Sequence, residues 1–508
     1  MTSYAVDDLQ WTDDPLWKQF ETHTRAAPDA AALITPDGRS WSRAELAQRA
    51  ATAAAALHAH GVQAGDRVMF EARKNVATAA TALALSRLGA ILCPFAPDLG
   101  RAERAVLQQR LNHIALIDGQ PGEHGDGETI DGLPGVRLQL RKRADLEPRD
   151  PRDPAAALIG FTSGTTGVPK GVMHTSAAMN YASRACAHVA GLAPGDAIAG
   201  LVPLASAPGF TFSVHFAFTL GHPLALVDPW DAATALRTIE RHACRWAMCV
   251  PTQLTAMIDA AGTHAPTSPL RALAVGGSSM TAELVARAEI ELGIRALRMF
   301  GMSECMGHAS TLPSDPIALR RSSDGLPFPG TQVEAFDTEL RMLPRGQRGQ
   351  AGVRGPSLFI GYCKGLGEHD ARCTPDGHFL TGDEIVRDAE GHVRVVGRIK
   401  DQIIRGGYNI DPAEVEAALM RHPAIATVAL VGVPERRLGE QACAVCCLRA
   451  ERPAPGLEDL KQHLAELGVS KKKWPEHLLI VDALPLTATG KVDKKQLAQL
   501  ATAGLAAR

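Results

Sequence analysis

The 508-residue sequence lacks an excess of charge of either sign, because 53 Lys and Arg residues stand against 55 Asp and Glu residues. A formal charge of -2 argues against a chain whose main task is to bind nucleic acid or an anionic membrane, and we predict neither partner. The first residues, MTSYAVDDLQWTDD, lack a positive segment followed by an apolar one. We therefore read no secretory signal and expect the protein in the cytoplasm. With 45% hydrophobic and 21% charged residues, the composition excludes a disordered chain.

One long segment lacks charged side chains, from residue 197 to residue 227, and its length alone would allow a membrane span. Five helix-breaking residues interrupt it: Pro203, Pro208, Gly209, Gly221 and Pro223. Because they divide the segment into pieces of strand or short-helix length, we predict a buried part of an α/β protein and no membrane span.

The ten cysteines lack the grouping of a zinc site. The one cluster, Cys443, Cys446 and Cys447 in QACAVCCL, has no second CxxC or CxxH partner, and a structural zinc ion needs four ligands. A free thiol behaves mostly as a small hydrophobe, so we predict a buried apolar strand here. A metal or redox site is the alternative.

The chain length, about three times that of an average domain, predicts two or three units. Up to about residue 300, helix and strand patterns alternate as in a sheet with crossover helices. We expect helices at 46–57, 76–88, 232–242, 252–261 and 281–291, and strands at 67–70, 90–94, 246–250, 270–275 and 296–300. After about residue 325, short segments punctuated by Gly and Pro predict β-hairpins or a small barrel. From about residue 401 we expect helices at 412–420, at 457–467 and from Lys494, and strands at 427–433 and around the cysteine cluster.

The strongest local signal is FTSGTTGVPKG at residues 161–171. Its glycines let backbone N–H groups approach phosphate oxygens, its hydroxyl groups add donors, and its lysine supplies positive charge. The segment lacks the Walker pattern, because Pro169 stands where that pattern needs a glycine before the lysine. It follows a strand-like run, and we predict a phosphate-binding loop.

This loop resembles the phosphate-loop signature of the adenylate-forming superfamily, which includes acyl-CoA and aryl-CoA synthetases, firefly luciferases and peptide-synthetase adenylation domains. Further segments resemble the other motifs of that superfamily in the same order, over almost the whole chain. They are FGMSE at 300–304, GLPFPG at 325–330, GVRGP at 352–356, TGD at 381–383, GRIKDQIIRGGYNIDPAEVE at 397–416 and LPLTATGKVDK at 484–494. Within the superfamily, the sequence is most like bacterial acyl-CoA ligases.

The resemblance implies an α/β fold with two domains. A large N-terminal domain, residues 1–396, would contain mixed α/β sheets and a small β-barrel-like subdomain and would bind ATP and the acid. Residues 397–400 would form a hinge, about which a smaller α+β C-terminal domain, residues 401–508, rotates. This hinge coincides with the change of sequence pattern near residue 400.

The resemblance also implies an AMP-forming acid-thiol ligase with two half-reactions. A carboxylate attacks the α-phosphate of ATP to give an acyl-adenylate and pyrophosphate, and a thiol then displaces AMP. The cofactors implied are ATP, Mg²⁺ and CoA. An anion must approach a polyanion in the first step, and Mg²⁺ and lysines reduce that repulsion. A homodimer is one assembly that this resemblance allows.

The motif match assigns candidate catalytic and nucleotide-binding residues. Glu304 matches the Mg²⁺-binding carboxylate, with Thr165 as a second catalytic and metal-binding candidate, and Lys491 matches the catalytic lysine of the C-terminal domain. Phe300 matches the aromatic residue that stacks on adenine, and Asp383 matches the residue that binds the ribose hydroxyls. The other nucleotide-binding candidates are Thr162, Ser163, Gly164, Thr166, Gly167, Lys170, Gly276, Gly277, Ser278, Gly301, Met302, Ser303 and Arg398.

Candidates for the thiol half-reaction lie in the C-terminal domain. Lys400 matches the hinge residue, and Gly406 and Gly407 match the loop that lines the pantetheine tunnel. Lys472 and Trp474 lie where relatives bind the nucleotide end of CoA, and a cation and an indole suit phosphate and adenine respectively. A solvated run of charges is the alternative for this pair.

The candidates that line the acyl site are Ser206, Ala207, Pro208, Gly209, Phe210, Met302, Met306 and Gly307. Many acyl-CoA and aryl-CoA ligases carry a His or an aromatic residue where Ser206 stands, so this serine implies more room and puts the efficiency of one half-reaction in doubt. The sequence lacks an aspartate at the position that binds an α-amino group, which disfavours an amino acid. Small and soft apolar residues predict a bulky apolar acid that is aromatic, alicyclic or polycyclic.

Three functions are compared on this basis. A complete acyl-CoA ligase is favoured by the motifs of both domains. The alternative is an adenylating enzyme that loads the pantetheine arm of a carrier protein. A catalytically weak binding protein is suggested by Ser206 and opposed by the presence of Glu304, Asp383 and Lys491.

Overall fold

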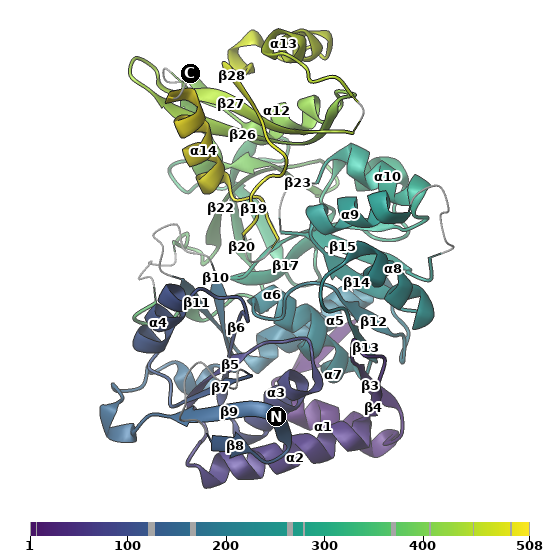
Figure 1. Cartoon of the computed structure of the whole chain (residues 1–508), viewed down its shortest axis with the longest axis vertical. Helices are drawn as coiled ribbons and strands as arrows, with labels where there is room; N and C mark the ends of the chain where they lie inside the picture. The colour runs from purple at the N-terminus through teal and green to yellow at the C-terminus, as the bar shows by residue number, and fades with distance from the viewer. Residues whose placement is uncertain are drawn as a thin grey trace.

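A computed structural model describes residues 2–6, 8–119, 128–162, 169–261, 268–277, 280–366, 372–405, 408–450, 452–487 and 490–506. It is a mixed α/β structure with a large N-terminal domain and a smaller C-terminal domain. Figure 1 shows the first part of the chain, in purple to teal, below, and the last part, in green to yellow, above it. This arrangement agrees with the predicted fold class.

The first large sheet has eight strands, of which the central four, β10, β6, β5 and β7, run parallel. In spatial order they are β21 (Gly361–Tyr362), β11 (Lys170–His174), β10 (Leu158–Thr162), β6 (Ile91–Phe95), β5 (Arg67–Glu71), β7 (Ala115–Asp118), β9 (Leu133–Leu140) and β8 (Glu128–Ile130). A separate hairpin consists of β1 (Ser3–Val6) and β2 (Leu9–Thr12).

The second large sheet has nine strands, and the six from β16 to β3 in its spatial order run parallel. That order is β18 (Leu326–Pro327), β17 (Cys305–Ser310), β16 (Ala296–Met302), β15 (Ala272–Gly276), β14 (Trp246–Cys249), β12 (Ile198–Gly200), β13 (Leu224–Leu226), β3 (Ala31–Ile34) and β4 (Ser40–Ser42). Parallel neighbours require crossover helices, which explains the alternating pattern of the sequence.

The helices of the large domain connect and cover these sheets. They are α1 (Leu16–Ala26), α2 (Arg43–Ala59), α3 (Val76–Leu88), α4 (Arg101–Arg110), α5 (Ser176–Ala190), α6 (Ala207–Phe210), α7 (Phe216–Leu220), α8 (Ala232–Arg241), α9 (Pro251–Ala261), α10 (Ala282–Glu291) and α11 (Ile317–Ser322). Short turns are η1 (Arg143–Asp145), η2 (Asp153–Ala155) and the π-helical turn η3 (Thr211–His215).

Local caps explain why the predicted helices begin and end where they do. In α2, the Ser42 hydroxyl accepts a hydrogen bond from the Glu45 amide and the Glu45 carboxylate accepts one from the Ser42 amide, which is a capping box. In α3, the Asn75 side chain accepts from the Thr78 amide, and Gly89 ends the helix at φ +68°, where a glycine is favoured. The expected helix at 76–88 is confirmed at both ends.

The segment after residue 325 forms a four-stranded antiparallel sheet where the barrel-like subdomain is expected. Its strands are β19 (Gln332–Phe336), β20 (Arg348–Arg354), β22 (Phe379–Arg387) and β23 (Val393–Arg398), in that order. Its buried apolar side chains, which include Val333, Val353, Ile385 and Val393, pack in one cluster with Phe300 of β16 and Cys305 of β17. The short 3₁₀ turn η4 (Ile399–Asp401) follows directly and leads into the C-terminal domain.

The C-terminal domain is a five-stranded sheet covered on two faces. Its elements are β24 (Ile403–Arg405), β25 (Tyr408–Ile410), α12 (Pro412–Leu419), β26 (Ile425–Glu435), β27 (Gly439–Leu448), α13 (Leu457–Glu466), η5 (Lys471–Lys473), β28 (His477–Ile480) and α14 (Lys494–Ala506). Leu419 of α12 and Leu464 of α13 pack in one apolar cluster, and Leu497 of α14 packs in another.

The cysteine cluster lies on β27 between these two layers, and the predicted buried strand is confirmed. Cys446 belongs to the apolar cluster under α12 and α13, whereas Cys443 belongs to the one under α14. Alternate side chains of a strand point to opposite faces. Cys443 and Cys446 therefore face away from each other, which argues against the alternative of a shared metal site.

The uncharged segment at 197–227 is divided as expected, into β12, α6, η3, α7 and β13. Phe216 of α7 is fully buried and stacks on Trp246 of β14 at 4.8 Å between ring centroids. In the described part of the chain, no helix is both long enough and apolar enough to cross a membrane.

Candidate active site

The candidate site lies at the carboxyl ends of parallel strands in the nine-stranded sheet. β15 ends at Gly276, and the neighbouring β16 ends at Met302. Ser303 and Glu304 form the turn into β17, because Met302 pairs with Cys305. Ligands of α/β sheets bind at this edge, and the two predicted nucleotide-binding segments are neighbours there.

Glu304 stands at the centre of the charged groups of the site. It is 7% exposed, and its Oε1 accepts a hydrogen bond of 2.8 Å from the hydroxyl of Tyr362. Burial lowers the pKa of Lys170 and the pKa of Lys491, and the negative charge of Glu304 opposes this shift in both lysines. One carboxylate and two ammonium groups, from three distant parts of the sequence, are therefore close enough to interact.

Lys491 reaches this edge from the C-terminal domain. A Cβ atom added to Gly277, at the end of β15, would lie 2.9 Å from Cε and 3.3 Å from Nζ of Lys491. The Thr252 hydroxyl at the start of α9 donates a 2.8 Å hydrogen bond to the carbonyl of Gly490. Besides burial, the charge of Arg398 lowers the pKa of Lys491. The structure thus holds the predicted catalytic lysine against the large domain.

Asp383 and Arg398 face each other on β22 and β23, where they are register partners. The Arg398 Nε donates to Asp383 Oδ1 at 3.0 Å, and the Asp383 amide donates to the Thr381 hydroxyl at 3.0 Å. Burial raises the pKa of Asp383 and Arg398 opposes the shift. The Asp383 side chain is 12% exposed, so it needs hydrogen-bond donors, and ribose hydroxyls are donors of this kind.

The predicted phosphate loop connects β10 and β11, which pair antiparallel with Thr162 opposite Lys170. The Lys170 Nζ lies 5.0 Å from the ring centroid of Tyr362, and the charge of Lys400 further lowers the pKa of Lys170. Lys400 of η4 is therefore near Lys170. The candidates Ser163, Gly164, Thr165, Thr166 and Gly167 lie outside the described residues, as do Ser278, Gly406 and Gly407.

The proposed adenine-stacking residue, Phe300, lies beside a buried histidine. His308 meets it edge to face at 4.5 Å between ring centroids, and burial lowers the pKa of His308 to about 3. His174 is also buried, with a pKa lowered to about 4, and its Nε2 donates to the carbonyl of Ser303 at 2.7 Å. Both histidines are thus neutral at physiological pH. His174 supports the turn at Ser303, His308 packs against Phe300, and neither adds charge to the site.

Several candidate acyl-site residues belong to the apolar core. Ala207, Phe210 and Met306 are buried in the same cluster. A Cβ atom added to Gly307 would lie 2.4 Å from the ring of Phe328, and one added to Gly301 would lie 3.0 Å from the Gly307 amide nitrogen. Gly209 is buried and Pro208 is half-buried on α6. The role of both acyl-site segments in binding an acid remains a prediction.

Ser206 caps α6, because its hydroxyl accepts a 3.0 Å hydrogen bond from the Gly209 amide. We expect Ser206→Ala to lower the free energy of unfolding by about 1 kcal/mol, the usual effect of losing an N-cap. Thermal unfolding of the two proteins measures this change. Because the hydroxyl is already engaged by the backbone, the adenylation rate should fall less than about tenfold. A larger rate loss at unchanged stability would instead give Ser206 a direct role in catalysis.

Lys472 and Trp474 lie together on the C-terminal domain. The Trp474 indole donates to the carbonyl of Val469 at 2.8 Å, and Lys472 Nζ lies 5.6 Å from the ring centroid of Tyr408. Arg405 donates to the backbone carbonyls of both Lys472 and Trp474. Within the described residues, no contact joins Lys472 or Trp474 to Glu304, Lys170 or Lys491. The role of Lys472 and Trp474 in binding CoA therefore remains a prediction.

The structure adds residues that the motif search did not find. Tyr362 contacts both Glu304 and Lys170, although no local pattern around it indicates a site. Arg348 on β20 forms ion pairs with Glu384 at 2.6 Å and with Asp411, the N-cap of α12, at 3.2 Å. The second pair joins the four-stranded sheet to the C-terminal domain. Only proximity in the fold reveals these contacts.

The residues at this edge fit Mg²⁺ and a nucleotide. Carboxylate oxygens are the ligands that Mg²⁺ prefers, and Glu304 presents one oxygen to Tyr362 while the other has no hydrogen bond among the described residues. Gly277, with φ +89°, leaves an open backbone beside Lys491 where any side chain would intrude. Lys170 and Lys491 supply the positive charge that a polyphosphate requires.

Two family models match the chain. The model described as AMP-binding enzyme matches residues 20–363, and the model described as AMP-binding enzyme C-terminal domain matches residues 414–491. Together they account for both parts of the molecule, with the first over the two large sheets.

Curated relatives and solved structures agree with these matches. The medium-chain fatty-acid-CoA ligase of Escherichia coli (strain K12) is 28% identical over 95% of this chain and 90% of its own length. The salicyl-AMP ligase/salicyl-S-ArCP synthetase of Mycobacterium tuberculosis is 30% identical over 96% of this chain and 91% of its own. ATP-bound MatB from Rhodopseudomonas palustris has a TM-score of 0.83 at 25% identity, over 96% of this chain and 99% of that one.

Proposed function

Because the chain belongs to the AMP-binding enzyme family, we propose that it is an ATP-dependent acyl-CoA ligase for a bulky apolar acid. The acid's carboxylate oxygen bonds to the α-phosphorus of ATP and the bond to pyrophosphate breaks. The sulfur of CoA then bonds to the carbonyl carbon and AMP leaves. The observation that carries this proposal is the approach of Lys491 to Gly277 beside Glu304 and Lys170.

In the first half-reaction, the side chains act on charge and position. Lys491 would hold the attacking carboxylate and the α-phosphate oxygens together, and Lys170 would bind the outer phosphates. Asp383 would accept hydrogen bonds from the ribose, with Arg398 beside it. Mg²⁺ bound at Glu304 would supply neutralising charge for the polyphosphate.

In the second half-reaction, the thiol must reach the carbonyl carbon from a direction that Lys491 does not block. We propose the division made from the sequence, with residues 1–396 as the large domain, a hinge at 397–400 centred on Lys400, and a mobile domain at 401–508. The contacts to be broken include the hydrogen bond from Thr252 to Gly490 and the ion pair between Arg348 and Asp411. Lys472 and Trp474 are then proposed to meet CoA.

For the acid, we expect aromatic, alicyclic or polycyclic acids to give at least about tenfold higher kcat/KM than short linear acids or amino acids. The physical reason is the apolar character of the candidate side chains Ala207, Phe210 and Met306. Pyrophosphate release with ATP over a panel of acids measures it. The panel includes medium-chain and long-chain fatty acids and hydroxybenzoic acids, because relatives are named for both classes. If short linear acids or amino acids are preferred, the proposed substrate class is wrong.

A second candidate is an adenylating enzyme that passes the acyl group to a carrier-protein pantetheine arm. One relative is named a salicyl-S-ArCP synthetase, and this name supports the second candidate function. Free CoA and a holo carrier protein can be compared as acceptors after the best acid is identified. Turnover with free CoA supports the ligase, and turnover with the carrier alone supports this candidate. A protein that binds ATP and the acid but releases no pyrophosphate would be the weak binding protein suggested by Ser206.

A further inference from the structure

Tyr362 occupies an edge position that brings it to the charged centre of the site. It ends the short strand β21, which pairs with β11 so that Val172 lies opposite Tyr362. β11 begins two residues earlier with Lys170, and the Lys170 ammonium lies over the Tyr362 ring at 5.0 Å from its centroid. The hydroxyl of the same ring donates to Glu304 Oε1 at 2.8 Å. One side chain therefore contacts both the candidate metal ligand and the candidate phosphate-binding lysine.

We propose that Tyr362 is a positioning residue for Mg²⁺-bound ATP, in which the hydroxyl orients the Glu304 carboxylate and the ring supports the Lys170 ammonium. The inference rests on the proposed function, because it assigns Glu304 and Lys170 their partners in that reaction. Tyr362 itself need not touch the substrate. Its part is to set the relative position of an anion and a cation that the family motifs identify separately.

The chemistry of each contact fits this role. A hydrogen bond to a carboxylate is stronger than one between neutral groups, and it fixes the rotation of the carboxylate about its last bond. A carboxylate oxygen can only accept in this contact, so the Tyr362 phenol is the donor. The ring face attracts the Lys170 cation through its quadrupole. Burial disfavours the charged form of Lys170, and the ring partly offsets that cost.

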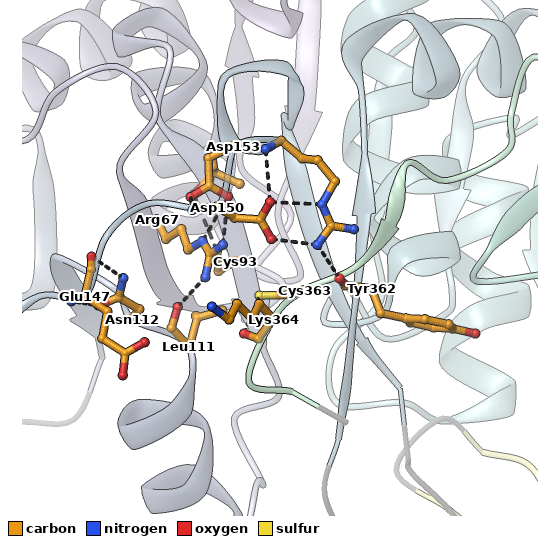
Figure 2. Close-up of polar contacts among 12 residues, drawn as sticks. Arg67, Cys93, Leu111, Asn112, Glu147, Asp150, Asp153, Tyr362, Cys363 and Lys364 are labelled. Atoms are coloured by element: carbon orange, nitrogen blue, oxygen red, sulfur yellow. Dashed lines mark hydrogen bonds and ion pairs between the residues drawn. The ribbon is translucent and has the colours of Figure 1, made fainter. Parts of the chain in front are cut away.

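The backbone of Tyr362 is held rigidly from the opposite side. Arg152 donates to the Tyr362 carbonyl at 2.8 Å, while Asp150 accepts two hydrogen bonds from its guanidinium, at 2.9 and 2.6 Å. Figure 2 shows Asp150 on one side of the Tyr362 backbone and the Tyr362 ring directed away from it. A Cβ atom added to Gly361, whose φ is +130°, would lie 2.2 Å from Arg152 Nη1, so the approach of the guanidinium requires glycine there.

The ion pair between Arg152 and Asp150 is itself anchored in the core of the large domain. The Asp150 amide donates to Asp153 Oδ2 at 3.2 Å, and Asp153 Oδ1 accepts from Arg67 at 2.8 and 3.2 Å. Arg67 also donates to the carbonyl of Leu111, as Figure 2 shows. Arg67 and Asp153 are 5% and 2% exposed. A buried, hydrogen-bonded network of this kind limits movement, and the position of the Tyr362 ring is therefore tied to the eight-stranded sheet.

The test compares Tyr362→Phe with the wild type in ATP binding by titration calorimetry, with and without Mg²⁺. Loss of the hydroxyl should weaken binding of Mg²⁺-bound ATP about tenfold or more, because a charge-assisted hydrogen bond to the metal-binding carboxylate is lost. Binding of ATP without Mg²⁺ should change less than about twofold, because the ring still supports Lys170. In Tyr362→Leu, which removes the ring as well, ATP binding should weaken in both conditions.

Tyr181→Phe is the matched control. Tyr181 is fully buried in the same domain, and its hydroxyl donates to the carbonyl of Pro329 at 2.6 Å and lies 2.9 Å from the Thr331 hydroxyl, so its hydrogen-bond partners are neither Glu304 nor Lys170. This variant loses a buried tyrosine hydroxyl, and its Mg²⁺-dependent gain in ATP affinity should equal that of the wild type. A merely structural role for Tyr362 would make the two Phe variants alike.

Each outcome decides one of the two hypotheses. If Tyr362→Phe binds ATP like the wild type, or loses the same affinity with and without Mg²⁺, the positioning role is wrong although the proposed function stands. If the wild type itself shows no Mg²⁺-dependent ATP binding, the proposed function fails first, and the inference fails with it. A selective loss in Tyr362→Phe, absent from Tyr181→Phe, supports both.

Discussion

Replacing Lys491 by alanine is expected to slow acyl-adenylate formation by about 100- to 1,000-fold, the usual effect of removing one group that stabilises developing charge. The ammonium lies at Gly277 within electrostatic reach of Glu304 and Asp383, where the carboxylate and the α-phosphate would meet. Pyrophosphate release under single-turnover conditions measures this step alone.

The control for Lys491→Ala is the second half-reaction. When the acyl-adenylate is supplied, formation of the acyl-CoA should stay within about threefold of the wild-type rate, because Lys491 acts only in adenylation. Equal loss of both half-reactions would contradict the proposal that Lys491 leaves the site between them. A loss confined to thiolation would assign the lysine the opposite role.

The pH dependence of the wild-type enzyme tests the same ammonium group. Burial, and then the charge of Arg398, lowers the pKa of Lys491 below the ordinary value of a lysine. The protonated form of Lys491 is the active one. The kcat/KM for adenylation is therefore at its maximum below this lowered pKa and falls as the pH rises through it. Lys491→Ala should lack this alkaline fall. If kcat/KM falls at alkaline pH in Lys491→Ala as it does in the wild type, the fall reports the deprotonation of another group.

Gly277→Ala is expected to reproduce most of the loss of adenylation rate predicted for Lys491→Ala, without changing the lysine. The new Cβ would lie 2.9 Å from Cε of Lys491, at a backbone φ of +89° that an L-residue rarely adopts, so Lys491 cannot enter as it does now. We expect adenylation to fall by about 10- to 100-fold, because a displaced catalytic group loses much of its effect. Thiolation of a supplied acyl-adenylate should change little.

A matched variant separates the steric effect from backbone strain. Gly293 also has positive φ, +63°, but a Cβ atom there would meet nothing within 4 Å. Gly293→Ala should lower stability by about 1 kcal/mol through strain alone and leave adenylation unchanged. In the double variant Gly277→Ala/Lys491→Ala, the rate should equal that of Lys491→Ala, because the two changes remove the same interaction. Additive losses would show that Gly277 acts on the nucleotide independently of the lysine.

Local sequence signals were sufficient to predict many elements and to nominate the candidate site residues. The helix at 76–88 was predictable because Asn75 and Gly89 provide its caps within the segment. Glu304 and Asp383 were identifiable because each lies inside a short motif. Ends set by tertiary pairing were less predictable: the strand expected at 270–275 is β15, which begins at Ala272 and continues to Gly276, where it pairs with β16.

Contacts between distant segments could not be predicted in this way. Tyr362 and Glu304 are 58 residues apart, and no periodicity connects them. The pairing of β21 with β11 and the turn between β16 and β17 create that contact. Arg348 and Asp411 likewise meet only because the C-terminal domain packs on the four-stranded sheet.

The sequence by itself determined many of the helices and strands, the order of the motifs and the chemical types at the candidate site, because these depend on residues close together in the chain. The tertiary structure alone decided that Lys491 lies against Gly277, that one tyrosine contacts both Glu304 and Lys170, and that Cys443 and Cys446 face opposite layers. The physical reason is that such contacts arise from burying apolar surface between whole elements. That burial brings together side chains whose interactions leave no local pattern in the sequence.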